Sequence, residues 1–168
     1  GTTCVGTTLL DVARNPVTGE LWVAGTDARN RTRFEPIVSG AGFDNRVTIV
    51  APGGAVTQVV PLGPPLLAAQ HSQPVALAFH DGPAGQFGYV ATLGDDSVVV
   101  LDALTALPQA ELAVGAQPAG LAADSARGLL YVLSRGDKTL RAFDVGSGHA
   151  PVGRVARLSY DPEPQAGS

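Results

Sequence analysis

The strongest constraint on the fold is that the chain repeats itself. Residues 74–102 read PVALAFHDGPAGQFGYVATLGDDSVVVLD, and residues 118–144 read PAGLAADSARGLLYVLSRGDKTLRAFD. The aligned pairs are Pro74 with Pro118, Leu77 with Leu121, Tyr89 with Tyr131, and Asp102 with Asp144. The offset is 44 residues at the start (118 minus 74) and 42 at the end (144 minus 102), after a two-residue difference in the first turn. This period is typical of a four-stranded propeller blade.

A third, more divergent copy precedes these two. It begins as LLDVARNPVTGELWVAG at Leu9, with Val12 opposite Leu77 and Trp22 opposite Tyr89. Its third strand, RVTIVAPGG, is delayed by an insertion. Each copy divides into four short strands separated by turn residues. In the second copy we expect these strands at about 75–79, 87–92, 97–102 and 110–114.

Glycine and proline content favours an all-β chain. The sequence has 21 Gly and 13 Pro, which indicates many tight turns between short elements. The apolar runs are too short and too often interrupted to sustain a helical stripe. Only residues 103–112, ALTALPQAEL, resemble a helix, and Pro108 lies inside them. We interpret this segment as the turn between a third and a fourth strand.

In the expected strands VTIVA, SVVVLD and TLRAFD, successive side chains point to opposite faces of the sheet and so toward different neighbouring blades. A single blade cannot bury both faces, so neighbouring blades must stack. We therefore predict an all-β partial β-propeller of about three four-stranded antiparallel blades, at residues 1–62, 74–115 and 118–158. Residues 159–168 are expected to form a Pro-rich tail or linker.

Three blades should not stand alone, because propellers close with four to eight blades and an open arc exposes its inter-blade faces. More blades must lie outside this sequence or come from another chain. The absence of Met favours the first alternative.

The repeat resembles the YVTN-repeat β-propellers. Their signature strand appears here as LWVAG, GYVAT and LYVLS, none of them a literal YVTN. The segment GTDARNRTRFEP, residues 25–36, is similar to a stretch in extracytoplasmic YVTN propellers that accompany, or are fused to, c-type haem domains of the di-haem peroxidase kind. The resemblance implies a periplasmic or secreted protein connected with electron transfer. The chain has no CxxCH motif, so we expect no cofactor within it, and any c-type haem would belong to a missing domain or a partner.

Charge and cysteine content argue against several kinds of partner and site. The net charge is -4, with one Lys and ten Arg, which provides no basic field for nucleic acid or an anionic membrane. No apolar run is long enough to cross a bilayer, so membrane insertion is not expected. Cys4 is the only cysteine, which excludes an internal disulfide framework and a multi-cysteine zinc site. We interpret Cys4 as a small apolar strand residue, and the alternative is a lipid or intermolecular link.

Two long insertions are expected to share one face of the arc. They are residues 26–44, between the second and third strands of the first copy, and residues 62–73, between the first and second copies. Connections in an antiparallel meander alternate between the two ends of the strands, which places both insertions at the same end. Because long loops in repeat proteins often carry function, we predict the binding surface there. We call this end of the arc the inserted face.

The candidate binding residues all lie in these insertions. They are Asp27, Arg29, Asn30, Arg31, Arg33, Phe34, Glu35 and His71. Arginine offers a planar fork for carboxylate, phosphate or haem propionate, and Phe34 could add a flat apolar contact. The alternative is a loop folded on its own Arg to Asp and Glu pairs, which are common and usually inert.

Histidine placement argues against a simple metal site. His71 is expected on the inserted face, whereas His80 and His149 fall at the opposite end of the blades, so the three should not converge. His80 aligns with Asn15 and Asp124, which predicts a turn role.

No Ser, His and acid set has nucleophile spacing, and no phosphate-binding loop is present. Asp102 and Asp144 recur at one blade position and should bond turn amides. Trp22, Tyr89 and Tyr131 should pack between blades.

These observations predict a non-catalytic binding or scaffold module that contacts a protein partner or the remaining blades of a larger extracytoplasmic protein or complex, and that serves a redox partner. The alternative is a fragment of a propeller enzyme, either haem peroxidase-associated or lactonase- or lyase-like, with its catalytic residues outside this chain.

Overall fold

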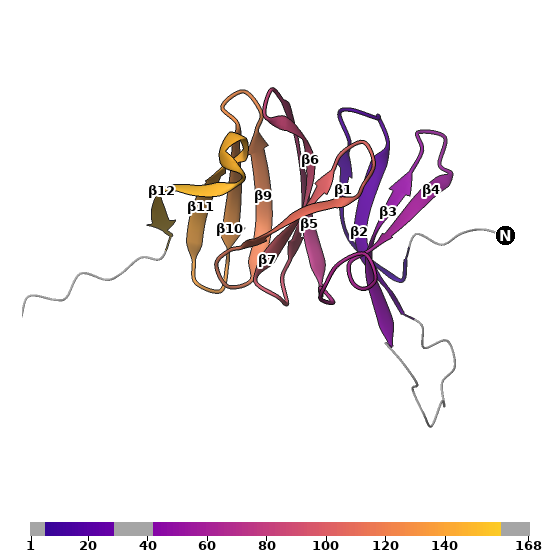
Figure 1. The fold of residues 1–168 in the computed structure, drawn as a ribbon. Coiled ribbons are helices and arrows are strands. Elements are labelled where there is room, and N and C mark those ends of the chain that lie inside the picture. Colours follow the sequence, from indigo (N-terminus) through magenta and orange to yellow (C-terminus); the bar gives the residue numbers. More distant parts are fainter. Residues whose placement is uncertain (1–5, 29–41, 159–168) are drawn as a thin grey trace, which may run out of the picture.

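The computed structural model describes residues 6–28 and 42–158, which form three antiparallel sheets (Figure 1). The first sheet contains β1 (Thr8–Arg14), β2 (Leu21–Ala28), β3 (Phe43–Val50) and β4 (Val56–Pro61). The second contains β5 (Pro74–Gly82), β6 (Gly85–Thr92), β7 (Ser97–Asp102) and β8 (Pro108–Ala113). The third contains β9 (Pro118–Asp124), β10 (Leu129–Ser134), β11 (Thr139–Asp144) and β12 (Ala150–Arg157).

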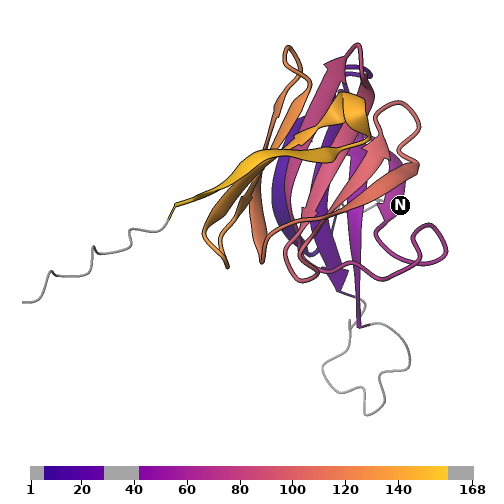
Figure 2. The ribbon, with the colours of Figure 1, turned by 60° about the vertical axis from the view of Figure 1, so that its left-hand side comes forward.

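Each sheet is a simple meander in which strands pair in chain order, so each sheet is one blade. We call them blades 1, 2 and 3. They stand side by side with blade 2 in the middle, as Figures 1 and 2 show. The four strands expected in the second copy are confirmed as β5 to β8. Cys4 and the predicted tail at 159–168 lie outside the described residues.

Strand β7 shows why the alternation in the sequence requires stacked blades. Val99 and Leu101 belong to the core that blade 2 shares with blade 1, whereas Val98 and Val100 belong to the core shared with blade 3. All four side chains are fully buried. A strand covered on both faces reads as a continuous apolar run, which SVVVLD is.

An aromatic contact and two polar bonds join blade 1 to blade 2. The ring of Trp22 meets that of Phe79 edge-on, with centroids 4.9 Å apart and planes at 76°. The Leu77 N–H donates to Asp11 Oδ2 at 2.7 Å, and Asn15 Nδ2 donates to the carbonyl of Ala103 at 2.6 Å. Because Asn15 is fully buried, these bonds also satisfy polar groups that water cannot reach.

Blades 2 and 3 share the second core. Tyr89 of β6 packs in one cluster with Leu130 of β10 and Phe143 of β11. Near the turns, the Asp81 N–H donates to Ser125 Oγ at 3.1 Å. The predicted inter-blade role is thus confirmed for Trp22 and Tyr89, whereas Tyr131 lies on the outer side of blade 3, beside Leu133 and Leu140.

The innermost strands β1, β5 and β9 line the axis of the arc, and β5 contacts both of the others. Each carries a one-residue irregularity near its start. The pairing shifts between Leu9 and Asp11 in β1, between Pro74 and Ala76 in β5, and opposite Leu133 and Ser134 in β9. The residues left out of register are Leu10, Val75 and Ala119, which occupy equivalent positions. A bulge re-aims a side chain, so this repeated feature changes the direction of one side chain near the start of each innermost strand.

The recurring aspartates bond turn amides, as predicted. Asp102 Oδ1 accepts from the N–H groups of Leu104 and Thr105, at 2.9 and 2.8 Å. Asp144 Oδ1 accepts from Gly146 and Ser147, and caps a short 3₁₀ turn. The Thr105 N–H bond holds the pKa of the Asp102 carboxyl below its usual value. Residues 103–107 form a turn rather than a helix, but the turn predicted over residues 103–112 is too long, because β8 begins at Pro108.

Candidate functional site

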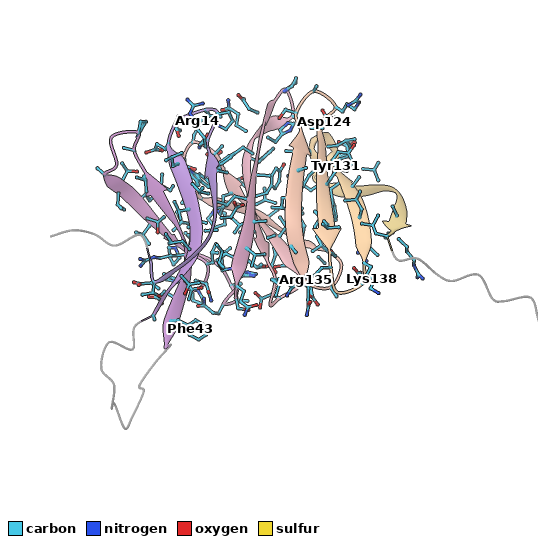
Figure 3. All side chains as sticks on the ribbon, turned by 180° about the vertical axis from the view of Figure 1, so that it is seen from behind. Arg14, Phe43, Asp124, Tyr131, Arg135 and Lys138 are labelled. Carbon is cyan, nitrogen blue, oxygen red and sulfur yellow. The ribbon has the colours of Figure 1, made fainter. Side chains whose placement is uncertain are left out.

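The described ends of the two insertions meet at one end of the arc. Asn45 follows the first insertion, and its carbonyl accepts from the N–H of Leu62, the first residue of the second insertion, at 2.9 Å. Figure 3 shows Phe43, Arg135 and Lys138 at this end, and Arg14 and Asp124 at the other. The prediction that both insertions belong to one face is confirmed for these residues.

A cavity of about 720 Å³ opens on the inserted face, beside the first residues of the innermost strands β1 and β5. It draws residues from all three blades and from the connection that enters β5. Its lining residues are Thr8, Leu10, Thr26, Phe43, Asn45, Ser72, Gln73, Val75, Leu93, Gly94 and Arg135. We call it the mouth cavity. Its volume lies within the range of about 300–1,000 Å³ that is usual for ligand pockets.

Apolar side chains make up much of this lining. Leu10 and Val75, the bulged residues of β1 and β5, both contribute, and Leu93 comes from the turn between β6 and β7. Phe43, at the start of β3, is 54% exposed although it is a large aromatic residue. An exposed apolar cluster around a concavity is typical of an interaction site.

Asn45 is one of the polar residues that line the cavity. The residue is 2% exposed, and its Oδ1 accepts from Thr26 Oγ1 at 2.8 Å. Its Nδ2 is buried and has no hydrogen-bond partner among the described residues. Buried amide groups are normally paired, so this donor pair is suited to an acceptor that enters the cavity.

Known proteins of similar structure identify the architecture. The chain is similar to Kuenenia stuttgartiensis hydrazine synthase, with a TM-score of 0.67 and 18% identity, over 83% of this chain and 46% of that one. It is similar to U3-55K, with a TM-score of 0.66 and 14% identity, over 92% and 40%, and to the WD40 repeats of RRP9, with a TM-score of 0.65 and 13% identity, over 89% and 38%. WD40 repeats form β-propellers. The chain is an arc of a β-propeller.

Identities this low show the fold alone. The propeller arc spans less than half the length of each of these three solved chains. No family model matches the sequence, and no curated protein matches it. The YVTN assignment and the link to c-type haem therefore stay predictions.

Most of the predicted binding residues fall in a part of the arc that the structure does not describe. Residues outside the described ranges are Arg29, Asn30, Arg31, Arg33, Phe34 and Glu35. Asp27 is described in β2, where its Oδ2 lies 3.1 Å from Arg46 Nη1 of β3. This ion pair across two strands accounts for Asp27 without a ligand.

His71 belongs to the interior of the propeller arc. It is 1% exposed, its Nδ1 lies 3.3 Å from Ser97 Oγ, and its Nε2 lies 3.4 Å from Glu111 Oε2. These partners belong to blade 2, so His71 fastens the second insertion to the blade that follows it. His71 is not among the residues that line the mouth cavity, and its ring is buried against blade 2, so its part in binding stays a prediction.

His80 and His149 gather at the other end of the arc, around Phe87. The ring centroids of His80 and His149 lie 6.4 and 5.2 Å from that of Phe87, and His149 Nε2 lies 3.0 Å from Tyr89 Oη. Burial lowers the pKa of both imidazoles, and the nearby His80 lowers that of His149 further. Burial also raises the pKa of Tyr89.

The turn role predicted for His80 is wrong. The residue is fully buried, and neither ring nitrogen has a partner among the described residues. Asn15, at the equivalent position of blade 1, does bond its own turn, through Oδ1 to the Val17 N–H. The separation of His71 from the other two histidines is confirmed. Within the described ranges, no group of three or more His, Cys, Asp or Glu side chains could hold a metal ion. Nor does any helix there have the length and apolar character needed to span a membrane.

Proposed function

We propose that this propeller arc is a non-catalytic binding module that holds a protein partner at the mouth cavity of its inserted face. The observation that carries this proposal is the cavity itself, where residues from three blades surround a concave apolar surface next to two long insertions. The titratable clusters of the described residues lie elsewhere: His71 is turned into blade 2, and His80 and His149 are at the far end. The lining is therefore better suited to binding than to acid–base or nucleophilic chemistry.

We also propose that the arc belongs to a larger propeller or complex. The outer side of each end blade presents residues that are buried at the equivalent positions inside the arc. Val12 of blade 1 is 57% exposed, whereas its counterpart Leu77 in blade 2 is 7% exposed. Leu133 of blade 3 is 39% exposed, whereas its counterpart Ala91 is fully buried. Further blades would shield these faces as blade 2 shields its neighbours, and the greater length of the similar solved chains agrees with this proposal.

An extracytoplasmic location and a redox partner carrying c-type haem form the finer part of the proposal. They rest on the resemblance of residues 25–36 and on no structural contact. The absorbance spectrum of the native complex tests them, since a c-type haem partner gives a strong Soret band. A complex without such a band would remove the redox element and leave the docking proposal unchanged.

Site-specific photo-crosslinking tests the docking function. Benzoylphenylalanine placed at Phe43, an aromatic position in the cavity wall, should capture one partner in extracts of the source organism. The matched control is the same residue at Leu104, which is 59% exposed in the turn between β7 and β8. Support requires that the captured protein, once purified, binds the arc directly. Equal capture from both positions, or none from Phe43, would contradict the proposal.

A further inference from the structure

We infer that the mouth cavity takes an uncharged, apolar peptide segment whose main-chain carbonyl accepts a hydrogen bond from Asn45 Nδ2. This inference rests on the proposed docking function and names the part of the partner that enters the site. It draws on three features of the cavity: its repeated apolar wall, its buried amide donor and the charges that surround it.

The apolar wall is built into the repeat. The same bulge in successive innermost strands brings Leu10 of β1 and Val75 of β5 to the lining, and Leu93 closes the side formed by blade 2. Leu10 is 43% exposed, so a ligand that covers it removes apolar surface from water. A wall of aliphatic side chains favours an aliphatic or aromatic anchor.

The hydrogen-bond donor at Asn45 orients a ligand within this apolar site. Thr26 Oγ1 donates a hydrogen bond to Asn45 Oδ1, which fixes the orientation of the amide. Nδ2 is then the atom of this amide that lacks a hydrogen-bond partner among the described residues. A neutral carbonyl oxygen satisfies an amide donor without bringing charge into a buried position. A peptide main chain offers such an oxygen beside its own side chains, which matches a donor surrounded by aliphatic residues.

The charges near the cavity argue against an acidic occupant. Asp95 and Asp96 directly follow the lining residue Gly94, and Asp95 accepts a hydrogen bond from the N–H of the lining residue Ser72. Arg135 is the one cation among the lining residues given above, and its Nε donates to Gln117 Oε1 at 3.3 Å. With two carboxylates and one guanidinium beside the cavity, a carboxylate on the ligand would meet a net negative charge, so acidic peptides should be selected against.

Three variants separate the contributions of the Asn45 donor and of the apolar wall to peptide binding. Asn45→Asp keeps an oxygen that can accept from Thr26 but removes the Nδ2 donor. Leu10→Asp places a charge on the apolar wall at an exposed position that folding tolerates. Leu104→Asp is the matched control, because it makes the same change at an exposed leucine away from the cavity. Thermal melts show which variants remain folded.

A phage-displayed library of random heptapeptides is the probe, panned on the full protein. We expect selected peptides to be rich in apolar residues and poor in Asp and Glu. Leu10→Asp should weaken their binding at least tenfold, folded Asn45→Asp should do so by a similar factor, and Leu104→Asp should leave it unchanged. In the ¹⁵N spectrum of wild-type protein, the side-chain amide signal of Asn45 should shift on peptide addition, while that of Asn15 should not.

Peptides that bind Leu10→Asp as well as wild type, an Asn45 signal that does not move, or a library that yields no binder would overturn the inference. The crosslinking experiment distinguishes this failure from failure of the docking function. A partner captured at Phe43 without peptide selection would leave docking standing and remove only the peptide ligand. Absence of both results would remove the docking function as well.

Discussion

Gly88→Ala should destabilise the arc, because blade 1 leaves no room for a side chain at this position of blade 2. A Cβ atom at Gly88 would lie 2.5 Å from Trp22 Cζ3, 3.0 Å from Trp22 Cη2 and 3.1 Å from Phe79 Cε1. Trp22 is 1% exposed and held edge-on against Phe79, so it cannot turn away into solvent. The tight contact is between blades, so the substitution tests whether the sheets stack as described.

The size of the effect follows from two opposing terms. Overpacking a close-packed core costs about 1–3 kcal/mol. Replacing glycine by alanine restricts the unfolded chain, which stabilises the folded protein by about 0.4–1 kcal/mol. The net loss should be about 1–2 kcal/mol, or roughly 2–8 °C in the unfolding midpoint for a chain of this length. Gly53→Ala is the control, since a Cβ there meets nothing within 4 Å and only the stabilising term applies.

A double-mutant cycle measured by chemical denaturation provides the decisive comparison. Trp22→Phe removes the ring atoms that would meet the new Cβ, and alone it leaves a cavity that destabilises the protein. In the double variant the methyl group added at position 88 occupies part of that cavity, so the two losses should fall short of additivity by more than about 1 kcal/mol. Additive losses, within about 0.5 kcal/mol, would mean that the two residues are not in contact and would refute the stacking of blades 1 and 2.

Two further predictions concern buried polar groups. Burial lowers the pKa values of His80 and His149, so below the ordinary value of about 6.5 the unfolded chain binds protons that the folded arc does not. The free energy of unfolding should therefore be constant above about pH 7.5 and decrease between pH 6.5 and 5.5. In pH-dependent melts, a His149→Phe variant should show a smaller decrease. A free energy of unfolding that does not change over this range would contradict the buried cluster of His80 and His149. Asn15→Ala should cost about 1–3 kcal/mol in denaturant titrations, because it leaves the Ala103 carbonyl and the Val17 N–H without their partner, and Asp124→Ala, at a more exposed turn, should cost less.

The blades could be predicted from the sequence because their signals are local and periodic. Tyr89 matches Tyr131 and Asp102 matches Asp144, so each pair marks a strand or a turn that recurs at the same position in successive blades. Strand order within a blade then follows from short connections. The aspartate turns were predictable for the same reason, since a carboxylate bonds amides only two or three residues away.

The site was harder to predict, because its residues come together only through register and stacking. Leu10 and Val75 reach the cavity through bulges, and a bulge is visible only once the partner strand is known. Asn45 lies between the first insertion and the predicted third strand RVTIVAPGG, and no pattern in the sequence indicated that it is buried in β3. The turn role predicted for His80 failed because its alignment with the polar turn residues Asn15 and Asp124 carries no information on depth below the surface.

Hydrogen exchange on the arc bound to its captured partner, or to a selected peptide, tests the central claim most directly. Occupation of the mouth cavity should slow amide exchange at residues 43–45, 72–75 and 93–94, and leave residues 103–107 and 124–128 at the opposite end unchanged. Protection confined to the opposite end, or to the outer strands of blades 1 and 3, would contradict a binding site in the mouth cavity.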